Sequence, residues 1–224
     1  MDPLLEPFSP REALLADIRA EARDTAGYTG RPELAPRVLA ALAAVPRDAF
    51  VEPDWQDMAW ADTSLPIGYR QTISQPFIVA LMTDLIEPGP DDVVLEVGTG
   101  SGYQAAVLAG LVRRVESIEV IEPLARTAAT RLREQGCDNV QVHVGDGHGG
   151  WPAGGPYDAI VVTAATPQVP PALVEQLKPG GRLVLPLGPL AGGQQLVRLH
   201  KDAHGHVTQQ TVLPVIFVPL TAPD

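Results

Sequence analysis

The chain has 224 residues and a formal net charge of −11, and its single cysteine is Cys137. Nucleic acids and anionic membranes bind proteins through clustered Lys and Arg, so this acidic balance without a basic cluster argues against both partners. A lone cysteine excludes a disulfide framework, and no apolar run approaches the roughly 20 residues of a membrane span. We therefore expect one cytoplasmic domain, long enough to bury a single core.

The N-terminal part is predicted to be helical. Ser9 and Glu12 have the pattern of a capping box at the start of a helix, and a second helix is expected to open at Pro36. Each carries its apolar residues on one face, and together they are too small to stand alone. Residues 1–67 are therefore expected to form a helical cap on the core. The aromatic residues expected to pack in this cap are Trp55, Trp60 and Tyr69.

A third helix is predicted from Pro76, after the stretch Q-T-I-S-Q-P that begins at Gln71. Ser74 is placed to cap this helix, because serine is a favoured N-cap residue. The turn E-P-G-P-D-D, which follows this helix, leads to a buried strand.

The stretch from Val93 to Leu111 predicts a strand, a tight turn and a helix. An apolar run rich in β-branched residues breaks into alternating glycines at Gly98, Gly100 and Gly102, and an alanine-rich helical pattern follows. Glycines take backbone angles closed to other residues and let a ligand approach the main chain. The start of the helix offers free N–H groups. The turn is therefore expected to bind a nucleotide-like cofactor.

The spacing around this turn favours adenosine over a dinucleotide. The dinucleotide pattern G-x-G-x-x-G needs a glycine where Tyr103 stands. Glu96, just before the turn, would repel a diphosphate but would attract an ammonium group, such as the one that S-adenosylmethionine carries. Glu119 ends the next predicted strand, about 20 residues after Gly98, where an acidic residue accepts hydrogen bonds from ribose hydroxyls.

The rest of the chain alternates strands and helices, which predicts a parallel sheet with right-handed crossovers. The expected strands are 115–120, 140–144, 158–163 and 182–187, and the expected helices are 123–135 and 171–177. The sequence K-P-G-G at 178–181 is expected to turn the chain into the strand that follows. Residues 195–200 and 209–218 flank a polar turn at 201–205, which predicts a hairpin.

The predicted fold is therefore α/β: a doubly wound, mostly parallel sheet with an antiparallel C-terminal portion and an N-terminal helical cap. We expect residues 68–188 to form the cofactor-binding core and residues 189–224 to complete the same domain as a hairpin. Ligands are expected at the carboxyl ends of the parallel strands.

Seven stretches together resemble one family. They are V-P-R-D-A-F-V from Val45, Q-T-I-S-Q-P from Gln71, L-E-V-G-T-G-S-G-Y from Leu95, V-G-D-G from Val144, Y-D-A-I-V-V-T-A-A from Tyr157, L-K-P-G-G-R-L-V-L-P-L-G from Leu177 and F-V-P-L-T from Phe217. The chain from about Leu34 onward is similar to the bacterial form of the protein-L-isoaspartate O-methyltransferases. The resemblance implies a Rossmann-like methyltransferase fold, S-adenosyl-L-methionine as cofactor and S-adenosyl-L-homocysteine as its product.

The resemblance also implies roles for individual residues. Ser74 matches the active-site serine of the family, and Glu119 would hold the ribose. The other residues implied in cofactor binding are Thr72, Ile73, Glu96, Gly98, Gly100, Asp146, Gly147 and Thr221. Glu96 and the two glycines would line the methionine part, and Asp146 and Gly147 would border the adenine, whereas Thr221 matches a threonine near the substrate pocket.

Methyl transfer to a carboxylate needs no general base, because a carboxyl with a reference pKa near 4 is ionised at pH 7. The protein must instead desolvate the carboxylate and align it with the methyl group. Ser74 is therefore assigned to orienting the substrate, and Arg70 is the nearest basic residue in sequence that would supply positive potential. The five histidines show no ligand spacing with acids or with Cys137, so no metal site is predicted.

The resemblance implies an isoaspartyl residue as substrate, whose free α-carboxylate is esterified so that repair can proceed through a succinimide. The expected partners are isoaspartyl proteins and peptides, and a monomer is expected. Two alternatives stay open at this point. One is a carboxyl methyltransferase that modifies normal aspartates in one dedicated peptide, and the other is an adaptor that binds S-adenosylmethionine without catalysis.

Overall fold

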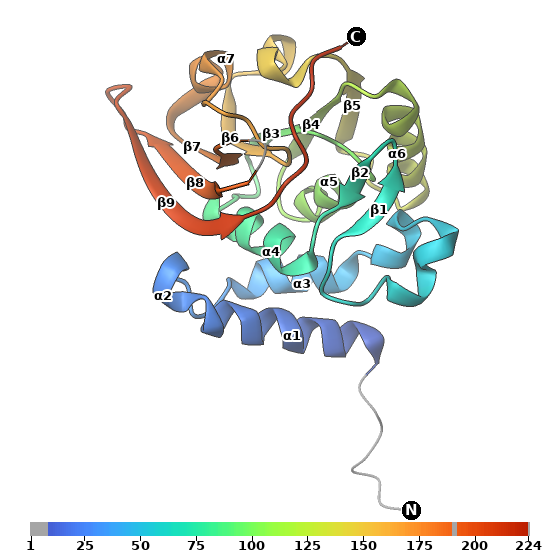
Figure 1. Cartoon of the computed structure of the whole chain (residues 1–224). Helices are drawn as coiled ribbons and strands as arrows, with labels where there is room; N and C mark the ends of the chain where they lie inside the picture. The colour runs from blue at the N-terminus through green and yellow to red at the C-terminus, as the bar shows by residue number, and fades with distance from the viewer. Residues whose placement is uncertain (1–8, 190–191, 224) are drawn as a thin grey trace, which may run out of the picture.

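The computed structural model describes residues 9–189 and 192–223, and its centre is a seven-stranded sheet (Figure 1). The strands of the chain are β1 (Leu65–Gly68), β2 (Gln71–Ile73), β3 (Val93–Val97), β4 (Arg114–Glu119), β5 (Val140–Val144), β6 (Tyr157–Val162), β7 (Leu177–Leu187), β8 (Gln194–Lys201) and β9 (Val207–Val215). The sheet has the order β5-β4-β3-β6-β7-β8-β9. All pairs from β5 to β7 are parallel, and β7-β8 and β8-β9 are antiparallel. The predicted fold class is confirmed.

Helices cover both faces of this sheet. They are α1 (Pro10–Asp24), α2 (Ala26–Thr29), α3 (Pro36–Ala44), α4 (Pro76–Leu85), α5 (Tyr103–Ala109), α6 (Glu122–Glu134) and α7 (Pro171–Glu175), with short 3-10 helices at Arg47–Phe50, Pro53–Met58, Gly147–Gly149 and Pro152–Gly154. Strand β3 is buried along its whole length, and its alternate side chains enter two different hydrophobic clusters. Val94 belongs to the cluster with α4 and α5, whereas Leu95 belongs to the cluster with α7. This double burial explains why β3 reads as a continuous apolar run.

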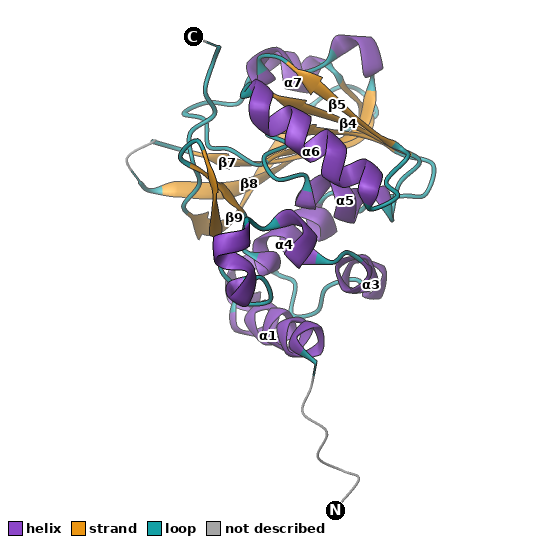
Figure 2. Ribbon diagram, turned by 90° about the vertical axis from the view of Figure 1, so that its right-hand side faces the viewer, coloured by secondary structure: helices purple, strands orange, loops and turns teal. Residues whose placement is uncertain are grey.

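The N-terminal helices form a second layer on one face of the sheet. Figure 2 shows α1 and α3 beneath α4, which is itself buried at every residue. The capping box of α1 is confirmed, because Ser9 Oγ accepts the Glu12 N–H (3.3 Å) and the Glu12 carboxylate accepts the Ser9 N–H (2.8 Å). The expected domain boundary after residue 67 falls inside the β1-β2 hairpin, which pairs Leu65 with Ile73.

The prediction that Ser74 caps α4 is wrong. Gln75 directly precedes the helix and makes no side-chain cap. The N–H of Phe77 instead donates to Asp62 Oδ1 at 2.8 Å. The acceptor therefore comes from a loop of the N-terminal layer, and the hydroxyl of Ser74 is left for another purpose.

Two further predictions are corrected near the C-terminus. The helix expected at 171–177 ends at Glu175, and the K-P-G-G sequence lies within β7, where the register with β6 shifts between Leu177 and Arg182. Strand β9 ends at Val215, three residues before the expected end. The chain then leaves the sheet and returns to β6, where the Ala165 N–H donates to the Val218 carbonyl at 2.7 Å.

The prediction that Tyr69 packs in the helical cap is also wrong, because its side chain lies in the turn of the β1-β2 hairpin and is 59% exposed. Trp60 does pack against the core, and the guanidinium of Arg11 lies 5.0 Å from its ring centroid. Trp55 is 41% exposed.

Candidate active site

The glycine turn after β3 has the backbone that its sequence predicts. Gly98, Gly100 and Gly102 have φ values of +96°, +54° and +92°, in the left-handed region that favours glycine. A Cβ at Gly98 would lie 2.5 Å from Thr163 Oγ1, which donates to the carbonyls of Val97 (3.1 Å) and Gly98 (2.5 Å). The end of β6 thus fixes the turn, and only glycine fits at residue 98.

Glu119 is held in place by the main chain around it. Its two carboxylate oxygens accept the N–H groups of Gly100 (2.8 Å) and Ile121 (3.0 Å), and its side chain is nearly buried at the end of β4. Each carboxylate oxygen can accept more than one hydrogen bond. The remaining acceptor positions are therefore free for a ligand's hydroxyl groups.

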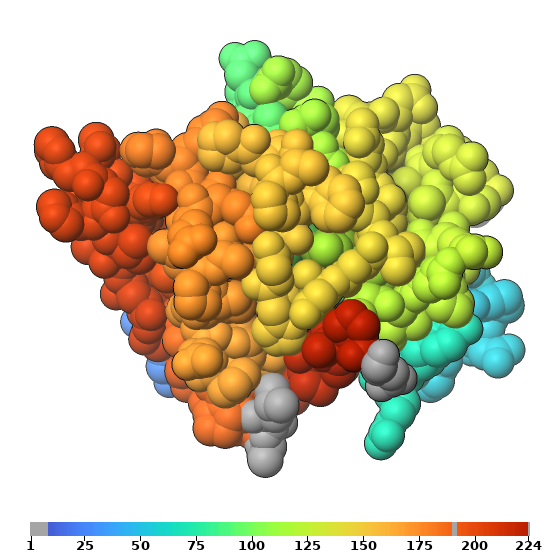
Figure 3. Space-filling view, turned by 90° about the horizontal axis from the view of Figure 1, so that it is seen from above, coloured from blue at the N-terminus to red at the C-terminus, as the bar shows by residue number. Residues whose placement is uncertain are grey.

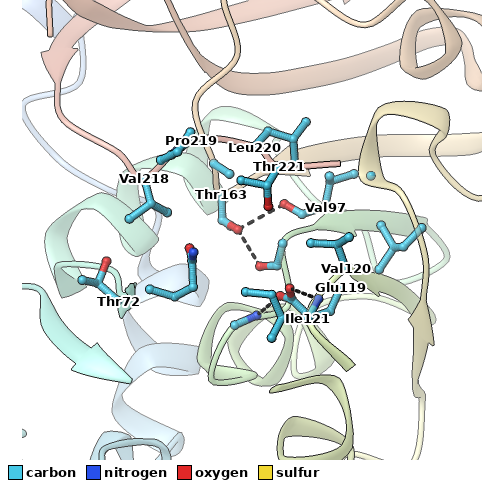
Figure 4. Close-up of a pocket in the computed structure, with 16 residues that line it drawn as sticks. Thr72, Val97, Glu119, Val120, Ile121, Thr163, Val218, Pro219, Leu220 and Thr221 are labelled. Atoms are coloured by element: carbon cyan, nitrogen blue, oxygen red, sulfur yellow. Dashed lines mark hydrogen bonds between the residues drawn. The ribbon is translucent and has the colours of Figure 1, made fainter. Parts of the chain in front are cut away.

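The glycine turn and Glu119 line one cavity, the first cavity, at the carboxyl ends of the parallel strands (Figure 4). Its wall is completed by the β1-β2 hairpin and by the C-terminal segment. The lining residues are Gln71, Thr72, Val97, Gly98, Gly100, Ile118, Glu119, Val120, Ile121, Gly147, Thr163, Ala164, Val218, Pro219, Leu220 and Thr221. Six of the residues predicted from the sequence are thus brought together: Thr72, Gly98, Gly100, Glu119, Gly147 and Thr221.

Three of the predicted cofactor residues do not line the first cavity. Glu96 is fully buried on β3, where its carboxyl accepts the hydroxyl of Ser117, and desolvation raises the pKa of Glu96 to about 8. Ile73 is buried in the core. Asp146 lies beside Gly147 and accepts hydrogen bonds from the N–H and Nδ1 of His148 at 2.9 and 2.8 Å.

A second cavity of about 710 Å³ adjoins the first one. It lies between the N-terminal layer, the segment before α4 and the ends of β8 and β9. Its lining residues are Glu21, Asp62, Thr63, Ser64, Thr72, Ser74, Gln75, Ile78, Thr163, Gly193, Gln194, Gln195, Leu213, Pro214, Val215, Ile216 and Phe217. Thr72 and Thr163 line both cavities, so the two spaces meet there, and Ser74 faces the second cavity only.

Ser74 is fixed from behind by a buried arginine. Arg47 is 0% exposed and donates to the carbonyls of Ala59 (2.6 Å), Thr63 (2.7 Å) and Ser74 (3.2 Å). Its guanidinium also lies 5.8 Å from the ring centroid of Tyr103. These bonds hold the segment before α4 at a fixed depth, so the Ser74 hydroxyl stays at the cavity wall.

Two acids, Glu21 and Asp62, lie side by side on the wall of the second cavity. The side-chain amide of Gln75 donates to Glu21 Oε2 (2.9 Å) and to Asp62 Oδ2 (3.2 Å). Burial, together with the hydrogen bond and the charge of Asp62, raises the pKa of Glu21 from its ordinary 4.5 to about 7. Near neutral pH this pair therefore holds a proton for part of the time.

The replacement Glu21→Gln is expected to change the pH dependence of stability. The folded chain binds the Glu21 proton more tightly than the unfolded chain does. The contribution of Glu21 to stability is therefore fully present below pH 4.5 and is lost as pH rises through about 7. Urea denaturation at pH 5 and at pH 8 gives the free energy of unfolding at each pH. The decrease in this free energy from pH 5 to pH 8 should be smaller in Glu21→Gln than in the parent. The exposed Glu33→Gln serves as control and should keep the parental fall; an unchanged profile in Glu21→Gln would contradict this expectation.

Sequence reasoning missed three residues of these cavities. Thr163 ends a predicted parallel strand, so the rule that ligands lie at the carboxyl ends of such strands could have found it. Glu21 and Asp62 carry no such signal, because their place in the second cavity depends on how the N-terminal layer packs.

The described residues, 9–189 and 192–223, offer neither a metal cluster nor a membrane-spanning helix. No group of three or more His, Cys, Asp or Glu side chains there is arranged to hold a metal ion. None of the helices in those ranges is both long enough and apolar enough to cross a membrane.

Comparison with known proteins decides the family. The family model described as protein-L-isoaspartate(D-aspartate) O-methyltransferase matches residues 30–224. The chain belongs to this family. Protein-L-isoaspartate O-methyltransferase 2 of Syntrophobacter fumaroxidans is 52% identical over 211 residues, which cover 94% of this chain and 85% of the relative. The enzyme of the same name from a Polaromonas species is 53% identical over 208 residues, which cover 93% of this chain and 99% of the relative.

A solved structure confirms the fold. The crystal structure of a Plasmodium falciparum protein described as a putative protein-L-isoaspartate O-methyltransferase, in complex with S-adenosyl-L-homocysteine, has a TM-score of 0.79 with 21% sequence identity. The match covers 96% of this chain and 99% of that one. The family predicted from the sequence is thus confirmed, and the chain is an S-adenosylmethionine-dependent methyltransferase.

The first cavity fits the cofactor of this family. A Cβ at Gly98 or at Gly147 would meet Thr163 or Val97 at 2.5 Å, so only glycine fits at these two positions of the cavity wall. Glu119 offers oriented acceptors, and neither cavity is lined by a Lys or Arg of the described residues, as suits a ligand without a pyrophosphate.

Glu119→Gln is expected to raise the dissociation constant of S-adenosylmethionine about 10- to 100-fold. The amide keeps one acceptor, but its NH₂ group meets an N–H donor of Gly100 or Ile121, and a hydrogen bond to a charged group is worth about 1.5–3 kcal/mol. Calorimetric titration with S-adenosylmethionine measures this change. Glu122→Gln is the matched control, because Glu122 is exposed and pairs only with Arg126 on α6; equal affinities in the two variants would exclude a ligand contact at Glu119.

Proposed function

We propose that the two cavities divide the methyl-transfer reaction between them. The first cavity would hold S-adenosylmethionine, and the second would hold the segment of a damaged protein or peptide that carries the isoaspartyl residue. The shared wall at Thr72 and Thr163 carries this proposal, because it is where contents of the two cavities can meet. Ser74 lies two residues beyond Thr72 in the second cavity.

The acceptor is the free α-carboxylate of the isoaspartyl residue. It is ionised at neutral pH, so no residue has to remove a proton from it. When bound, S-adenosylmethionine supplies a methyl group on a positively charged sulfur. The residues of this chain then have to bind the carboxylate, exclude water from it and hold it in line with that methyl group.

Ser74 is suited to this positioning role. Its hydroxyl makes no hydrogen bond to another residue of the described ranges, and its carbonyl is held by Arg47. The hydroxyl is therefore available to donate to one carboxylate oxygen from a fixed position. Ser74 acts in this proposal as the residue that orients the substrate.

Several residues are proposed to hold the cofactor. Glu119 would accept hydrogen bonds from the ribose hydroxyls, while Gly98 and Gly100 would let the methionine part approach the main chain. Gly147 and Asp146 would border the adenine, with Thr72 and Thr221 closing the cavity. Glu96 and Ile73 lie behind this wall and would act by supporting the turn and the hairpin.

We further propose that the partners are isoaspartyl proteins and peptides, that the chain acts as a monomer, and that it works in the cytoplasm. The acidic net charge and the lone Cys137 support these proposals. The division into a cap at 1–67, a core at 68–188 and a C-terminal hairpin at 189–224 is proposed as the order of parts within one domain.

Paired peptides test the function directly. The purified chain is incubated with methyl-labelled S-adenosylmethionine and with two peptides that differ only in isoaspartate or aspartate at one position. Labelling of the isoaspartyl peptide alone is expected. Equal labelling of both would favour modification of normal aspartates, and binding of the cofactor without labelling of either would favour an adaptor.

Ser74→Ala is expected to lower kcat/KM for the isoaspartyl peptide about 10²- to 10³-fold, as when a donor that stabilises a reacting oxygen is removed. The affinity for S-adenosylmethionine should stay unchanged, because Ser74 does not line the first cavity. Ser64→Ala is the control, since Ser64 lines the second cavity too. A similar loss in both variants, or none in Ser74→Ala, would remove Ser74 from its proposed role.

A further inference from the structure

The turn of the β1-β2 hairpin has an unusual backbone. Tyr69 and Arg70 are its two central residues, and both have positive φ values, +50° and +61°. Two consecutive left-handed residues form the tight hairpin turn that is normally built from Asn-Gly, because side chains beyond Asn and Gly are disfavoured there. The hairpin therefore keeps a tyrosine and an arginine at its turn although both strain the backbone.

Both of these side chains are exposed and lie outside the hydrophobic core. Tyr69 is 59% exposed and Arg70 is exposed as well. Within the described residues neither side chain makes a hydrogen bond or an ion pair, and the turn is held by the pairing of Gly68 with Gln71. Backbone strain at residues whose side chains make no stabilising contact is typical of segments that contact a ligand.

The turn lies directly beside the candidate active site. Gln71 and Thr72, the next residues along the chain, line the first cavity, and Thr72 also lines the second. Figure 3 shows the hairpin (teal) standing out from the surface next to the C-terminal segment (red), which forms the opposite part of the cavity wall. A macromolecule bound at the second cavity would extend past this projection.

The chemistry of the turn fits a protein partner. Tyrosine and arginine are the residue types, with tryptophan, that most often dominate protein–protein contacts, because each combines a large flat surface with hydrogen-bond donors. The acids Glu21, Asp62 and Glu119 line the two cavities, and the chain has a net charge of −11. Arg70 is thus an exposed cation directly before Gln71, which lines the first of these acidic cavities.

We propose that Tyr69 and Arg70 form a docking surface for the substrate protein outside the isoaspartyl residue itself. Tyr69 packs on an apolar side chain of the segment next to the damaged residue, and Arg70 donates to a carboxylate or to main-chain carbonyls of that segment. This inference rests on the proposed function. It adds that the hairpin turn distinguishes a long substrate from a short one that fits within the second cavity.

The double replacement Tyr69→Asn with Arg70→Gly tests the docking surface, because it restores the unstrained turn and removes both side chains. The melting temperature should be unchanged or raised by about 2–4 °C. The sequence alone marks Arg70 as the nearest basic residue for the substrate carboxylate, but neither Tyr69 nor Arg70 lines the first or the second cavity. For an isoaspartyl pentapeptide kcat/KM should therefore stay within about 2-fold of the parent. For an aged protein substrate that contains isoaspartate, KM should rise about 10-fold with kcat nearly unchanged, as for the loss of uniform binding.

Control variants separate the possible outcomes. His204→Gly alters an exposed residue of the β8-β9 turn and should leave both substrates unaffected. In the variant Tyr69→Phe with Arg70→Lys, KM for the protein substrate should lie close to the parental value. Equal KM values for the protein in the parent and in the Asn-Gly variant would overturn the docking surface, as would an equal loss for both substrates. A parent chain that methylates neither substrate would overturn the proposed function instead.

Discussion

Gly98→Ala is expected to raise the dissociation constant of S-adenosylmethionine about 100-fold. A Cβ in the left-handed region costs about 1–2 kcal/mol, and overpacking typically costs about 1–3 kcal/mol more. Here the Cβ would lie 2.5 Å from Thr163 Oγ1, which cannot withdraw without giving up its bonds to the carbonyls of Val97 and Gly98. The turn must therefore move, and with it the main chain that is proposed to face the cofactor. Calorimetric titration and the melting-temperature shift with S-adenosylmethionine measure the loss.

Gly136→Ala is a matched control for this substitution. Gly136 has φ +72°, yet its Cβ would meet no heavy atom within 4 Å, and it lies just beyond the end of α6. Gly136→Ala should lose only the stability that a Cβ in the left-handed region costs, and it should bind the cofactor as the parent does. Thr163→Ala combined with Gly98→Ala should recover part of the affinity, because the clashing oxygen is gone. Parental affinity for S-adenosylmethionine in Gly98→Ala, or an equal loss of affinity in both glycine variants, would contradict the requirement for glycine at residue 98.

Much of the first cavity was predictable because its signals are local. A strand, a glycine turn and a helix follow one another between Val93 and Leu111, and a parallel sheet brings Glu119 to the same edge from the next strand. The structure places Gly98, Gly100 and Glu119 on one cavity as these signals indicate. The Gly100 N–H that binds Glu119 links two residues only 19 positions apart.

The second cavity was less predictable because its contacts are distant in sequence. Gln75 reaches Glu21 across 54 positions, and Arg47 reaches Ser74 across 27. Ser74 shows how a local rule fails. Serine before Gln-Pro reads as a helix cap, but Asp62 occupies the first free N–H of α4 from another layer. No sequence pattern near Ser74 predicts that Asp62 accepts this N–H.

Glu96 illustrates a different limit. Its position before the glycine turn predicts a contact with the cofactor's ammonium group. The alternation of β3 instead points its side chain into the core beside Ser117, since successive strand residues face opposite sides of a sheet. A strand buried on both faces gives no sign in its sequence of which face holds the ligand.

Arg47→Met is expected to lower the free energy of unfolding by about 3 kcal/mol, although Arg47 lines neither cavity. The methionine leaves the carbonyls of Ala59, Thr63 and Ser74 without their donor, and a buried polar group without a partner costs about 1–3 kcal/mol. Part of the loss is recovered where water reaches the less buried carbonyls. The melting temperature should fall by about 6–12 °C for a domain of this size. Thermal and urea denaturation measure both quantities.

The same variant should affect the functions of the two cavities differently. Because Arg47 fixes Ser74 and lines neither cavity, KM for an isoaspartyl peptide should rise while the affinity for S-adenosylmethionine changes little. Arg47→Lys keeps the charge but cannot reach three carbonyls with one nitrogen, so its losses should be intermediate. The exposed Arg37→Met, on α3 of the same layer, should shift stability by no more than about 0.5 kcal/mol. Loss of cofactor binding in Arg47→Met at a temperature where it is folded would show that the guanidinium supports the first cavity and not Ser74 alone.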